Sequence, residues 1–470
     1  MTTSHHELQR ARETSSADLE IDSLEDIATS VRRLGTTVVL FLSPHQHEAP
    51  MRAVSRNGKS LTELHHEYTE PLHERGEPIP RGVLLEFELD KGYIGYNCSQ
   101  AFQQTVENDE GESEERWYIA VRKEIEGTEG ARVGFYFQPK NSPGGPPDTG
   151  VWQLDTKRQL PYDTIDFIED ETPYEPALTP VFIQPNFENV SSYTPPDMPN
   201  KPDSHQDPSV AEGKLNREPL LAMTAVIARS FRPLASAPDK KRFPYHQEFF
   251  IGSSINDLER VAVGPEDRKG TRIVYLGDNR WGVFNRPQSG QGAEFGPGVV
   301  TYAEFTATTR EEFISGLQEA ILDTSTVIPD LCQDGEWVGP NFGWPLKAKN
   351  EEDENNSDPS RKKRRIGMIG HIATYINRST EEREYCATSY IYDPNSNTTE
   401  EVKIIVAKEA FEGLVGRRIE RDDLDRVIYP GGAVLLPNGK LRLYCGISDL
   451  KAGYVDIDDP FAGLRIETLN

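Results

Sequence analysis

Short stretches in which apolar and polar residues alternate recur along most of the chain, and they predict β-strands. Residues 116–124 and 131–138 alternate in this way, and residues 150–154 follow a turn rich in Pro and Gly. Alternation over four to eight residues is typical of a strand that buries one face. The first third of the chain is therefore expected to contain three successive strands.

The same pattern returns later around tight-turn sequences. Residues 272–284 carry two apolar stretches around Gly277-Asp278-Asn279, and residues 432–444 do so around Pro437-Asn438-Gly439. Residues 365–376, 384–392 and 401–407 form a further strand-like group. Asn-Gly between apolar strands is the strongest short hairpin signal. Antiparallel hairpins repeated along a chain favour a β-propeller, which is built from small four-stranded sheets.

Helical periodicity is rare. Residues 309–323 show it, and Thr309 and Glu312 are spaced as a capping box at their start. A doubly wound α/β sheet needs a helix after most strands, so an all-β fold is favoured. A second amphipathic helix is predicted between residues 15 and 35, where the apolar residues at helical spacing are Leu19, Ile21, Leu24, Ile27, Val31 and Leu34.

Polar segments divide the chain. We expect residues 1–80 to hold a polar tail, the amphipathic helix and a connection, and residues 81–470 to form the β-domain. Nine prolines between residues 171 and 219 predict a long disordered insertion, and residues 350–365 predict a second one. The second ends in a basic run at residues 361–365. Such a run is typical of a nuclear import signal or of a charged loop between strands, and we favour the loop.

Composition excludes several classes of protein. The net charge is −26, and an acidic surface repels phosphate backbones, so we expect no nucleic-acid partner. The N-terminal residues lack the apolar stretch of a secretory signal, and no early apolar run is long enough to span a bilayer. We therefore predict a cytoplasmic protein without a membrane partner.

Motifs for metals and cofactors are missing from the sequence. The four cysteines show no Cys-x-x-Cys spacing. There is no Gly-x-Gly-x-x-Gly after a strand, no Gly-Lys-Ser phosphate loop and no Gly-x-Ser-x-Gly elbow. We therefore predict neither a bound metal nor a cofactor.

Two adjoining segments resemble a known group of enzymes. Residues 425–434 (DRVIYPGGAV) and 436–449 (LPNGKLRLYCGISD) resemble the closing blades of five-bladed propeller glycosidases and β-mannoside phosphorylases. More closely, residues 83–465 resemble a microbial family of unknown function related to those enzymes. That resemblance depends on residues 272–288, 336–341, 370–373 and 403–407. It implies a five-bladed β-propeller fold, but no assigned reaction. Together with the patterns above, the predicted fold is an all-β, five-bladed β-propeller with an N-terminal helical extension and long disordered loop insertions.

The chain departs from the family pattern at three polar positions. Gly95 stands where the pattern has an acidic residue before Tyr96-Asn97. The pattern also has a Lys-Asp pair where this chain has Lys269-Gly270. Phe342 replaces an acid next to Asn341. These losses favour a changed or absent activity.

Inverting cleavage of a glycoside needs a proton donor and either a base for water or a bound phosphate. Asp425 is the first candidate, because it immediately precedes an apolar strand, with Glu124 or Glu336 as the second carboxylate. The structural alternative for Asp425 is a solvated turn carboxylate. Six further residues are candidates for binding a ligand: Arg122, Arg286, Asn341, His371, Asp449 and Trp337.

Four of these ligand-binding candidates also have a structural alternative. Arg286 is suited to phosphate or carboxylate by bidentate hydrogen bonds, or it forms a salt bridge between blades. His371 binds a ligand or is a satisfied interior histidine. Asp449 contacts a sugar or closes an Asx turn. Trp337 stacks on a sugar ring or fills a core.

The sequence thus predicts a carbohydrate-active propeller protein with an inverting glycoside hydrolase or phosphorylase activity in a central channel. Its expected ligands are a small molecule or an oligosaccharide, with inorganic phosphate as a co-substrate of the phosphorylase. Two alternatives remain, because fold does not fix function. One is a non-catalytic propeller that binds a metabolite or a protein. The other is a pathway tailoring enzyme that reuses the pocket.

Overall fold

The computed structural model describes most of the region from residue 54 to residue 466. The predicted helix at residues 15–35, most of the insertion at 171–219 and residues 350–364 lie outside the described residues. The described ranges are 54–55, 58–74, 80–108, 110–125, 131–140, 145–158, 171–172, 181–183, 220–229, 232–234, 237–242, 245–252, 254–265, 268–287, 299–333, 335–348, 365–380, 382–415, 422–461 and 464–466.

Strands dominate these residues, as the alternating pattern predicts. They are accompanied by two α-helices, α3 (Leu61–Glu74) and α4 (Arg310–Ala320), and two short 3₁₀ helices, η6 (Lys408–Phe411) and η7 (Asp422–Leu424). The described chain is therefore mostly β-sheet, in agreement with the predicted class.

The strands form groups that follow one another in sequence. The first group comprises β3 (Glu86–Phe87), β4 (Tyr93–Cys98), β5 (Phe102–Glu107), β6 (Ser113–Ile125), β7 (Ala131–Pro139) and β8 (Val151–Leu154). The second comprises β9 (Glu171–Thr172), β10 (Val181–Ile183), β11 (Leu220–Arg229), β14 (Tyr245–Gly252) and β15 (Glu259–Val263). A separate ribbon consists of β12 (Arg232–Leu234) and β13 (Ala237–Arg242).

Three further groups follow. The third comprises β16 (Arg272–Gly277), β17 (Arg280–Asn285), β18 (Thr301–Thr306) and β19 (Thr326–Val327). The fourth comprises β20 (Glu336–Ala348), β21 (Arg365–Asn377), β22 (Glu382–Asp393) and β23 (Thr398–Val406), with β1 (Val54–Ser55) and β27 (Leu464–Ile466) at its edges. The fifth comprises β24 (Arg426–Leu435), β25 (Leu441–Ile447), β26 (Lys451–Ile457) and β2 (Val83–Leu84).

The fourth and fifth groups are connected into one ten-stranded sheet. Their link is a short parallel pairing of β22 with β24, in which Glu384 opposes Arg426 and Tyr385 opposes Val427. Within each of these two groups the strands are antiparallel. The ten-stranded sheet is therefore two antiparallel units joined at one edge.

Tight turns explain why the predicted hairpins form. β16 and β17 are joined by Asp278 and Asn279, whose φ angles are 52° and 58°. Two successive residues with positive φ match the right-handed twist of the strands that they connect. Asp and Asn tolerate this conformation better than other side chains do, so the local sequence selects the turn.

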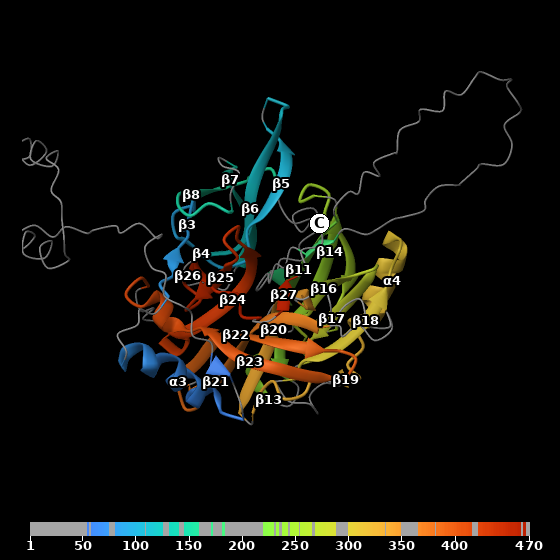
Figure 1. Ribbon diagram of the computed structural model, residues 1–470. Coiled ribbons are helices and arrows are strands. Elements are labelled where there is room, and N and C mark those ends of the chain that lie inside the picture. The colour runs from blue at the N-terminus through green and yellow to red at the C-terminus, as the bar shows by residue number, and fades with distance from the viewer. Residues whose placement is uncertain are drawn as a thin grey trace, which may run out of the picture. The chain divides into compact units, whose positions relative to one another are not determined.

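Helix α4 begins where the sequence predicts. Thr309 accepts a hydrogen bond from the backbone of Glu312, and the Glu312 side chain bonds back to the cap backbone. This capping box satisfies amides that the helix itself leaves unpaired. Phe313 and Leu317 are buried on the face that packs on the third strand group (Figure 1).

Helix α3 lies inside the polar stretch that was expected to be a connection. Its apolar residues are few, but Leu61, Leu64 and Tyr68 share one face and are almost completely buried. That face packs on β21 and β23 of the fourth group (Figure 1). Because only this narrow stripe is apolar, the overall composition of the stretch is polar and does not indicate a helix.

Five clusters of buried apolar residues form the core of the described chain. Each cluster joins two strand groups that follow one another, and the fifth joins the last group to the first. In chain order the junctions are marked by Phe102 with Phe250, Phe249 with Trp281, Phe284 with Ile372, Ile369 with Leu443, and Tyr444 with Trp117.

Glycines permit the close contact between the fifth and first groups. A side chain at Gly431 would overlap the carbonyl oxygen of Cys98, and one at Gly446 would overlap the amide oxygen of Asn97. The sequence Pro430-Gly431-Gly432 also contains a bulge in β24. The Pro-Gly-Gly segment therefore serves the packing between strands far apart in the chain.

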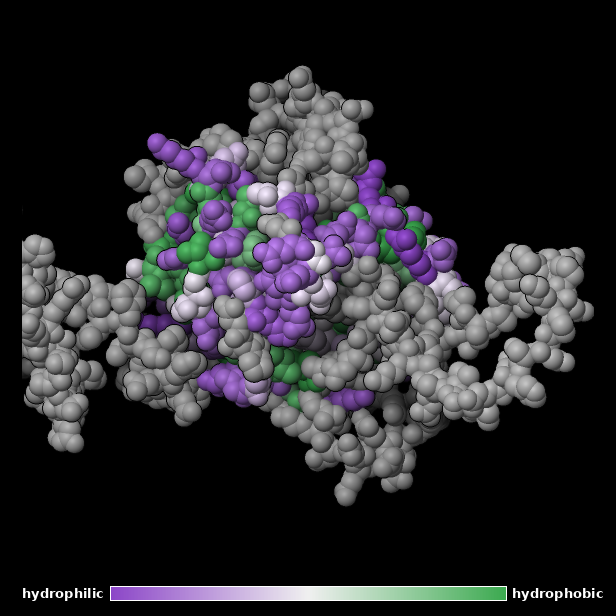
Figure 2. Space-filling model, turned by 90° about the horizontal axis from the view of Figure 1, so that it is seen from above, coloured by the Kyte–Doolittle hydropathy of each residue, from purple (hydrophilic) through white to green (hydrophobic). Residues whose placement is uncertain are grey.

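The surface seen from above is mostly hydrophilic among the described residues (Figure 2). Smaller hydrophobic areas lie between the polar side chains in this view. Neither helix in the described residues has the length and apolar character that crossing a bilayer requires.

Candidate functional site

A buried histidine, His371, lies in the middle of β21 with polar partners on both ring nitrogens. Its Nδ1 is 2.8 Å from Oδ1 of Asn341, and its Nε2 is 3.5 Å from Nη1 of Arg286. A guanidinium can only donate hydrogen bonds, so Nε2 is the acceptor. The ring proton therefore lies on Nδ1, which donates to Asn341.

Cationic side chains keep His371 neutral. Burial, together with the charges of Arg286, Arg272 and Lys269, holds the pKa of His371 well below its usual range. The imidazole is therefore uncharged at pH 7, and the surrounding charge is positive. We call Lys269, Arg272, Arg286, Asn341 and His371 the cationic cluster.

Arg286 has unused donor capacity in this cluster. Its side chain is almost fully buried, and its Nε has no hydrogen-bond partner among the described residues. A buried guanidinium donor without a partner is costly, because its hydration is lost and not replaced. An anion with two oxygens would satisfy it through charge-assisted bonds.

Arg272 is held in a fixed orientation. Its Nε donates to the carbonyl of Asn341 over 2.9 Å, and its Nη1 donates to the carbonyl of Thr271 over 2.8 Å. Its Nη2 lies 3.4 Å from the hydroxyl of Tyr429 in β24. One guanidinium thus links the third, fourth and fifth strand groups beside His371.

Two glycines make room for the His371 ring. In the register of β20 and β21, Gly339 opposes His371, and a Cβ at Gly339 would overlap the imidazole. A Cβ at Gly370 would in turn overlap the carbonyl oxygen of Gly339. The position of the imidazole therefore depends on residues without side chains.

Aromatic residues continue from His371 along the same face of the sheet. On β21, Ala373 and Tyr375 share the face of His371, because side chains alternate along a strand. Trp337 on β20 and Tyr385 on β22 are the register partners of Ala373. We call Trp337, Tyr375 and Tyr385 the aromatic row.

The rings of this row contact one another. The Tyr385 ring stacks on His371 at 5.5 Å between centroids, and Trp337 lies 5.7 Å from Tyr385. Trp337 lies 5.0 Å from Tyr375 and donates from Nε1 to the Tyr385 hydroxyl over 3.2 Å. The predicted ligand residue Trp337 is thus connected to the cationic cluster through Tyr385.

Glu336 lies on the opposite face of this sheet, one residue before Trp337. Its carboxylate accepts from the backbone N–H of Leu61 over 2.5 Å and from that of Gln333 over 2.9 Å. Leu61 is the first residue of α3. Glu336 therefore satisfies an amide at the start of the helix.

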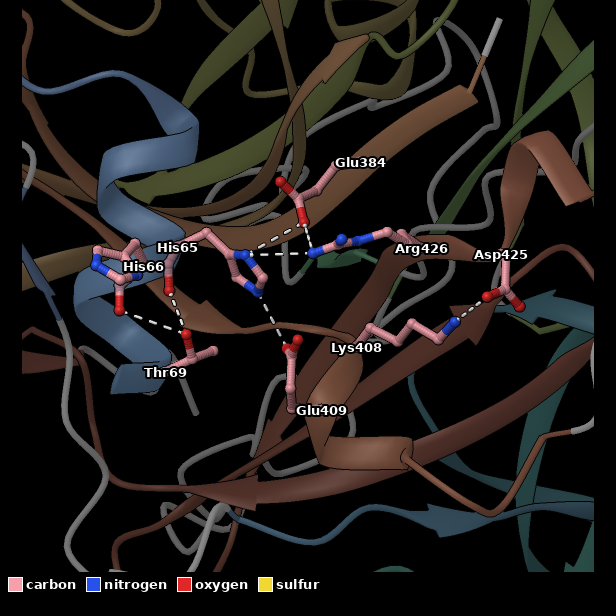
Figure 3. Close-up of polar contacts among 8 residues, drawn as sticks. All are labelled: His65, His66, Thr69, Glu384, Lys408, Glu409, Asp425 and Arg426. Carbon is pink, nitrogen blue, oxygen red and sulfur yellow. Dashed lines mark hydrogen bonds and ion pairs between the residues drawn. The ribbon is translucent and has the colours of Figure 1, made fainter. Parts of the chain in front are cut away.

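His65 provides a second attachment of α3 (Figure 3). Its Nδ1 is 3.2 Å from Oε1 of Glu384, and its Nε2 is 3.1 Å from Oε2 of Glu409. Arg426 also binds Glu384, over 2.6 Å. Burial opposes a charge on His65, but the Glu409 hydrogen bond and the two carboxylates outweigh it and raise the pKa of His65.

Asp425, the first catalytic candidate, forms an ion pair with Lys408 (Figure 3). About a third of its side chain is exposed, 32% by area. It immediately precedes Arg426, whose register partner is Glu384. Asp425 therefore lies just before β24 and beside the start of β22, one position ahead of the pair Arg426 and Glu384.

Glu124, Arg122 and Asp449 come together elsewhere, around β4. The Tyr96 hydroxyl and Nη2 of Arg122 both donate to Glu124, the guanidinium over 2.7 Å. Nδ2 of Asn97 donates to Asp449 over 3.1 Å. Asn97 and Asp449 have φ angles of 46° and 47°, a left-handed conformation that Asn and Asp tolerate better than other side chains do.

The predicted site residues thus fall into four places. Arg286, Asn341 and His371 meet directly, with Trp337 reached through Tyr385. Arg122, Glu124 and Asp449 surround Tyr96 and Asn97, whereas Glu336 holds α3 and Asp425 pairs with Lys408. The residues that the sequence did not point to are Lys269, Arg272, Tyr375, Arg383 and Tyr385. No spacing could have found them, since they come from three strands and a preceding loop.

The departures from the family pattern lie close to these residues. Gly270 has φ +79°, and a Cβ there would lie 3.5 Å from Cδ of Arg286. The Phe342 ring packs on Trp344 at 4.4 Å. Position 270 therefore borders the cationic cluster, where the family pattern has an acid.

Among the described residues, no group of three or more His, Cys, Asp or Glu side chains is arranged to hold a metal ion. The donor set around His371 is cationic, so it suits an anion.

Comparison with known families confirms the resemblance to a family of unknown function. Residues 234–463 match the family model described as "Protein of unknown function (DUF1861)". This match covers slightly less than half of the chain, a shorter part than the 83–465 expected from the sequence. No curated protein matches the chain.

The chain is similar to several solved structures of low sequence identity, and the two with TM-scores above 0.5 share its fold. A GDP-Man-dependent mannosyltransferase from Leishmania mexicana has a TM-score of 0.55 and 19% identity, over 86% of this chain and 96% of that one. A hypothetical protein from Leishmania major has a TM-score of 0.51 and 18% identity, over 84% and 95%. A mannose phosphorylase from Leishmania mexicana, in complex with phosphate ion, has a TM-score of 0.49 and 19% identity, over 85% and 95%.

Proposed function

We propose that this chain is a carbohydrate-active protein that binds phosphate, free or carried by a sugar, at the cationic cluster. The observation that carries the proposal is the convergence of Lys269, Arg272 and Arg286 on a neutral histidine in a chain whose net charge is −26. Guanidinium and ammonium groups close together in a protein bind an anion through charge-assisted hydrogen bonds. The unpartnered Nε of Arg286 supports the same ligand.

We further propose a five-bladed β-propeller as the arrangement of the strand groups. Four core clusters each join two consecutive groups, and the fifth cluster joins the last group to the first, as a closed ring requires. The pairing of β2 with β26 supports closure, because a strand from the start of the described chain completes the last group. In such a ring, the cationic cluster would face the central channel.

The proposed reaction is inverting cleavage of a glycoside by phosphate or water. Phosphate at Arg286 and His371 would supply the nucleophile of a phosphorylase, and a carboxylic acid would protonate the leaving oxygen. Asp425 is the preferred acid, because it lies just before β24 and next to the start of β22. Glu124 is the second candidate. The contacts of Glu336 with Leu61 and Gln333 favour a structural role for that residue.

A non-catalytic binding protein is the second candidate function. It is favoured by Gly270, which borders Arg286 where the family pattern described above has an acid. Such a protein would keep the anion site and lack turnover.

Isothermal titration of the purified full chain with inorganic phosphate and mannose 1-phosphate tests the proposal. Mannose is chosen because a mannosyltransferase shares the fold. We expect saturable binding that Arg286→Gln weakens at least tenfold, because the replacement removes the charge and the paired donors. Arg310→Gln is the matched control, since Arg310 forms an exposed ion pair with Glu259.

Product analysis separates the reactions. Incubation with mannobiose, with and without phosphate, would give a phosphate-dependent product for a phosphorylase and a phosphate-independent one for a hydrolase. In either case Asp425→Asn should abolish turnover while phosphate binding persists. Binding without any product would support the non-catalytic candidate. Equal affinities of the wild type, Arg286→Gln and Arg310→Gln would contradict the anion site.

A further inference from the structure

We propose that the aromatic row and Arg383 form an outer subsite for an oligosaccharide, extending from the cationic cluster by at least one further sugar residue. This inference rests on the proposed function and adds the size of its ligand. Tyr375 would contact the distal sugar ring, supported by Trp337 and Tyr385.

The sheet register places these side chains in rows on one face. Tyr375 and Arg383 oppose each other, and Ala373 is opposed by Trp337 on one side and Tyr385 on the other. The rings of Trp337 and Tyr385 meet beside the small side chain of Ala373 and contact each other. His371 begins the face at its inner end. The face is therefore aromatic and cationic from His371 to Arg383.

The length of this face exceeds one sugar. His371 and Tyr375 are four residues apart on β21, so their Cα atoms lie about 13 Å apart at the usual rise per residue. A single pyranose bound through phosphate at His371 would not reach the ring of Tyr375. A ligand that contacts both ends must carry at least two sugar residues.

Exposure increases along the same direction. His371 is 2% exposed, Trp337 is 8% exposed and Tyr375 is 38% exposed. Trp337 contacts both other rings of the row, at 5.0 Å from Tyr375 and 5.7 Å from Tyr385 between centroids. The half-open ring of Tyr375 thus lies on a rigid support, which reduces the entropy lost when a ligand binds.

The chemistry of the face matches a sugar that bears an anion. Aromatic rings offer a flat apolar surface with a polar edge, which suits the C–H face and the hydroxyl rim of a pyranose. The guanidinium of Arg383 lies 5.7 Å from the centre of the Tyr375 ring. Arg286, Lys269 and Arg383 all act on Tyr385 as positive charges. The face therefore combines stacking with cationic hydrogen-bond donors.

The other face of the same strands is already covered. Val338, Ile372 and Cys386 lie there and pack in one cluster with Leu61, Leu64 and Tyr68 of α3. An internal packing role thus accounts for one face only. The neighbouring residue Ile376 is 44% exposed and lies at the bulge that follows Tyr375 in β21.

Titration of the full chain with a sugar series tests the inference. The probes are mannose, mannobiose and mannotriose, and glucose, cellobiose and cellotriose, each with and without inorganic phosphate. We expect one series to bind more tightly as its length grows from one to two residues. Tyr375→Ala should then weaken binding of the longer sugars about tenfold and leave inorganic phosphate binding unchanged. Tyr375→Phe should retain most of the affinity, since the ring remains.

Ile376→Ala is the matched control, because it removes a neighbouring exposed apolar side chain that has no aromatic ring. Equal affinity of Tyr375→Ala and Ile376→Ala for every sugar overturns the subsite, even where phosphate still binds. A preference for monosaccharides overturns it as well. If the wild type binds neither phosphate nor any sugar, the proposed function and this inference both fail.

Discussion

Nδ1 of His371 donates to Oδ1 of Asn341 over 2.8 Å, and this bond leaves Nε2 facing Arg286 as an acceptor. The cationic cluster therefore contains a neutral imidazole whose bare nitrogen accepts from a guanidinium. Protonation of that nitrogen would place a fourth positive charge among Lys269, Arg272 and Arg286. A bound anion would offset the repulsion between these positive charges, so ligand binding and protonation of Nε2 of His371 are linked.

The first prediction concerns the pH dependence of stability through His371. Its pKa is lowered in the folded state, so the unfolded chain binds the proton more readily. Stability is therefore lost as the pH falls below about 6.5, at up to about 1.4 kcal/mol per pH unit. Urea unfolding of the wild type and of His371→Gln between pH 5 and 8 should show this slope only in the wild type. A slope unchanged by the substitution would contradict the assignment.

The second prediction has the opposite sign and concerns His65. The carboxylates of Glu384 and Glu409 raise its pKa in the folded state, against the effect of burial. Its stabilising contribution is thus complete below about pH 6.5 and is lost as the pH rises through the folded pKa. Hydrogen exchange of α3 amides should accelerate over that range in the wild type. His65→Gln should show fast exchange at every pH. His66→Gln is the control, since His66 is on the same helix and its side chain is 67% exposed.

The third prediction separates a structural role of Glu336 from a catalytic one. Glu336→Ala leaves the buried N–H of Leu61 without its carboxylate, which should lower the free energy of unfolding by about 2 kcal/mol. Turnover per folded molecule should be unchanged. Urea unfolding and activity per folded protein measure the two effects. Loss of turnover at wild-type stability would instead restore Glu336 as a catalytic candidate.

The fourth prediction concerns the space that Gly339 leaves for His371. A methyl group at Gly339 overlaps the imidazole, so Gly339→Ala must displace His371 from Arg286 and Asn341. Overpacking of this kind costs about 1–3 kcal/mol, and phosphate binding should be lost with it. Gly95→Ala is the control, because a Cβ there makes ordinary contacts of 3.4 Å with Phe87 and Val121. If Gly339→Ala retained the wild-type affinity for phosphate, phosphate binding would not depend on the position of the His371 ring.

The strands and tight turns were predicted from local sequence patterns. The hairpin around Asp278 and Asn279 and the capping box of Thr309 and Glu312 both depend on contacts between residues within a few positions of each other. Such contacts are encoded in short sequences, so they were predictable. Helix α3 was missed, because its stability depends on three apolar residues packing against strands that lie some 300 positions later.

The candidate site shows the same division. From the sequence, Arg286, Asn341 and His371 were candidates one at a time, by the chemistry of their side chains and by a family resemblance. Only the tertiary structure brings these three residues into contact. It also places four further residues beside them: Lys269, Arg272, Tyr375 and Tyr385.

The sequence by itself determined that the chain is mostly β-sheet, where its tight turns lie and which residues have side chains able to bind an anion or a sugar, since these properties belong to single residues and short segments. Only the tertiary structure decided that Glu336 holds α3, that Asp425 pairs with Lys408 and that three cations surround one neutral histidine. Those relationships depend on pairing and packing between strands that are distant in the chain, and no local pattern records which distant strands will meet.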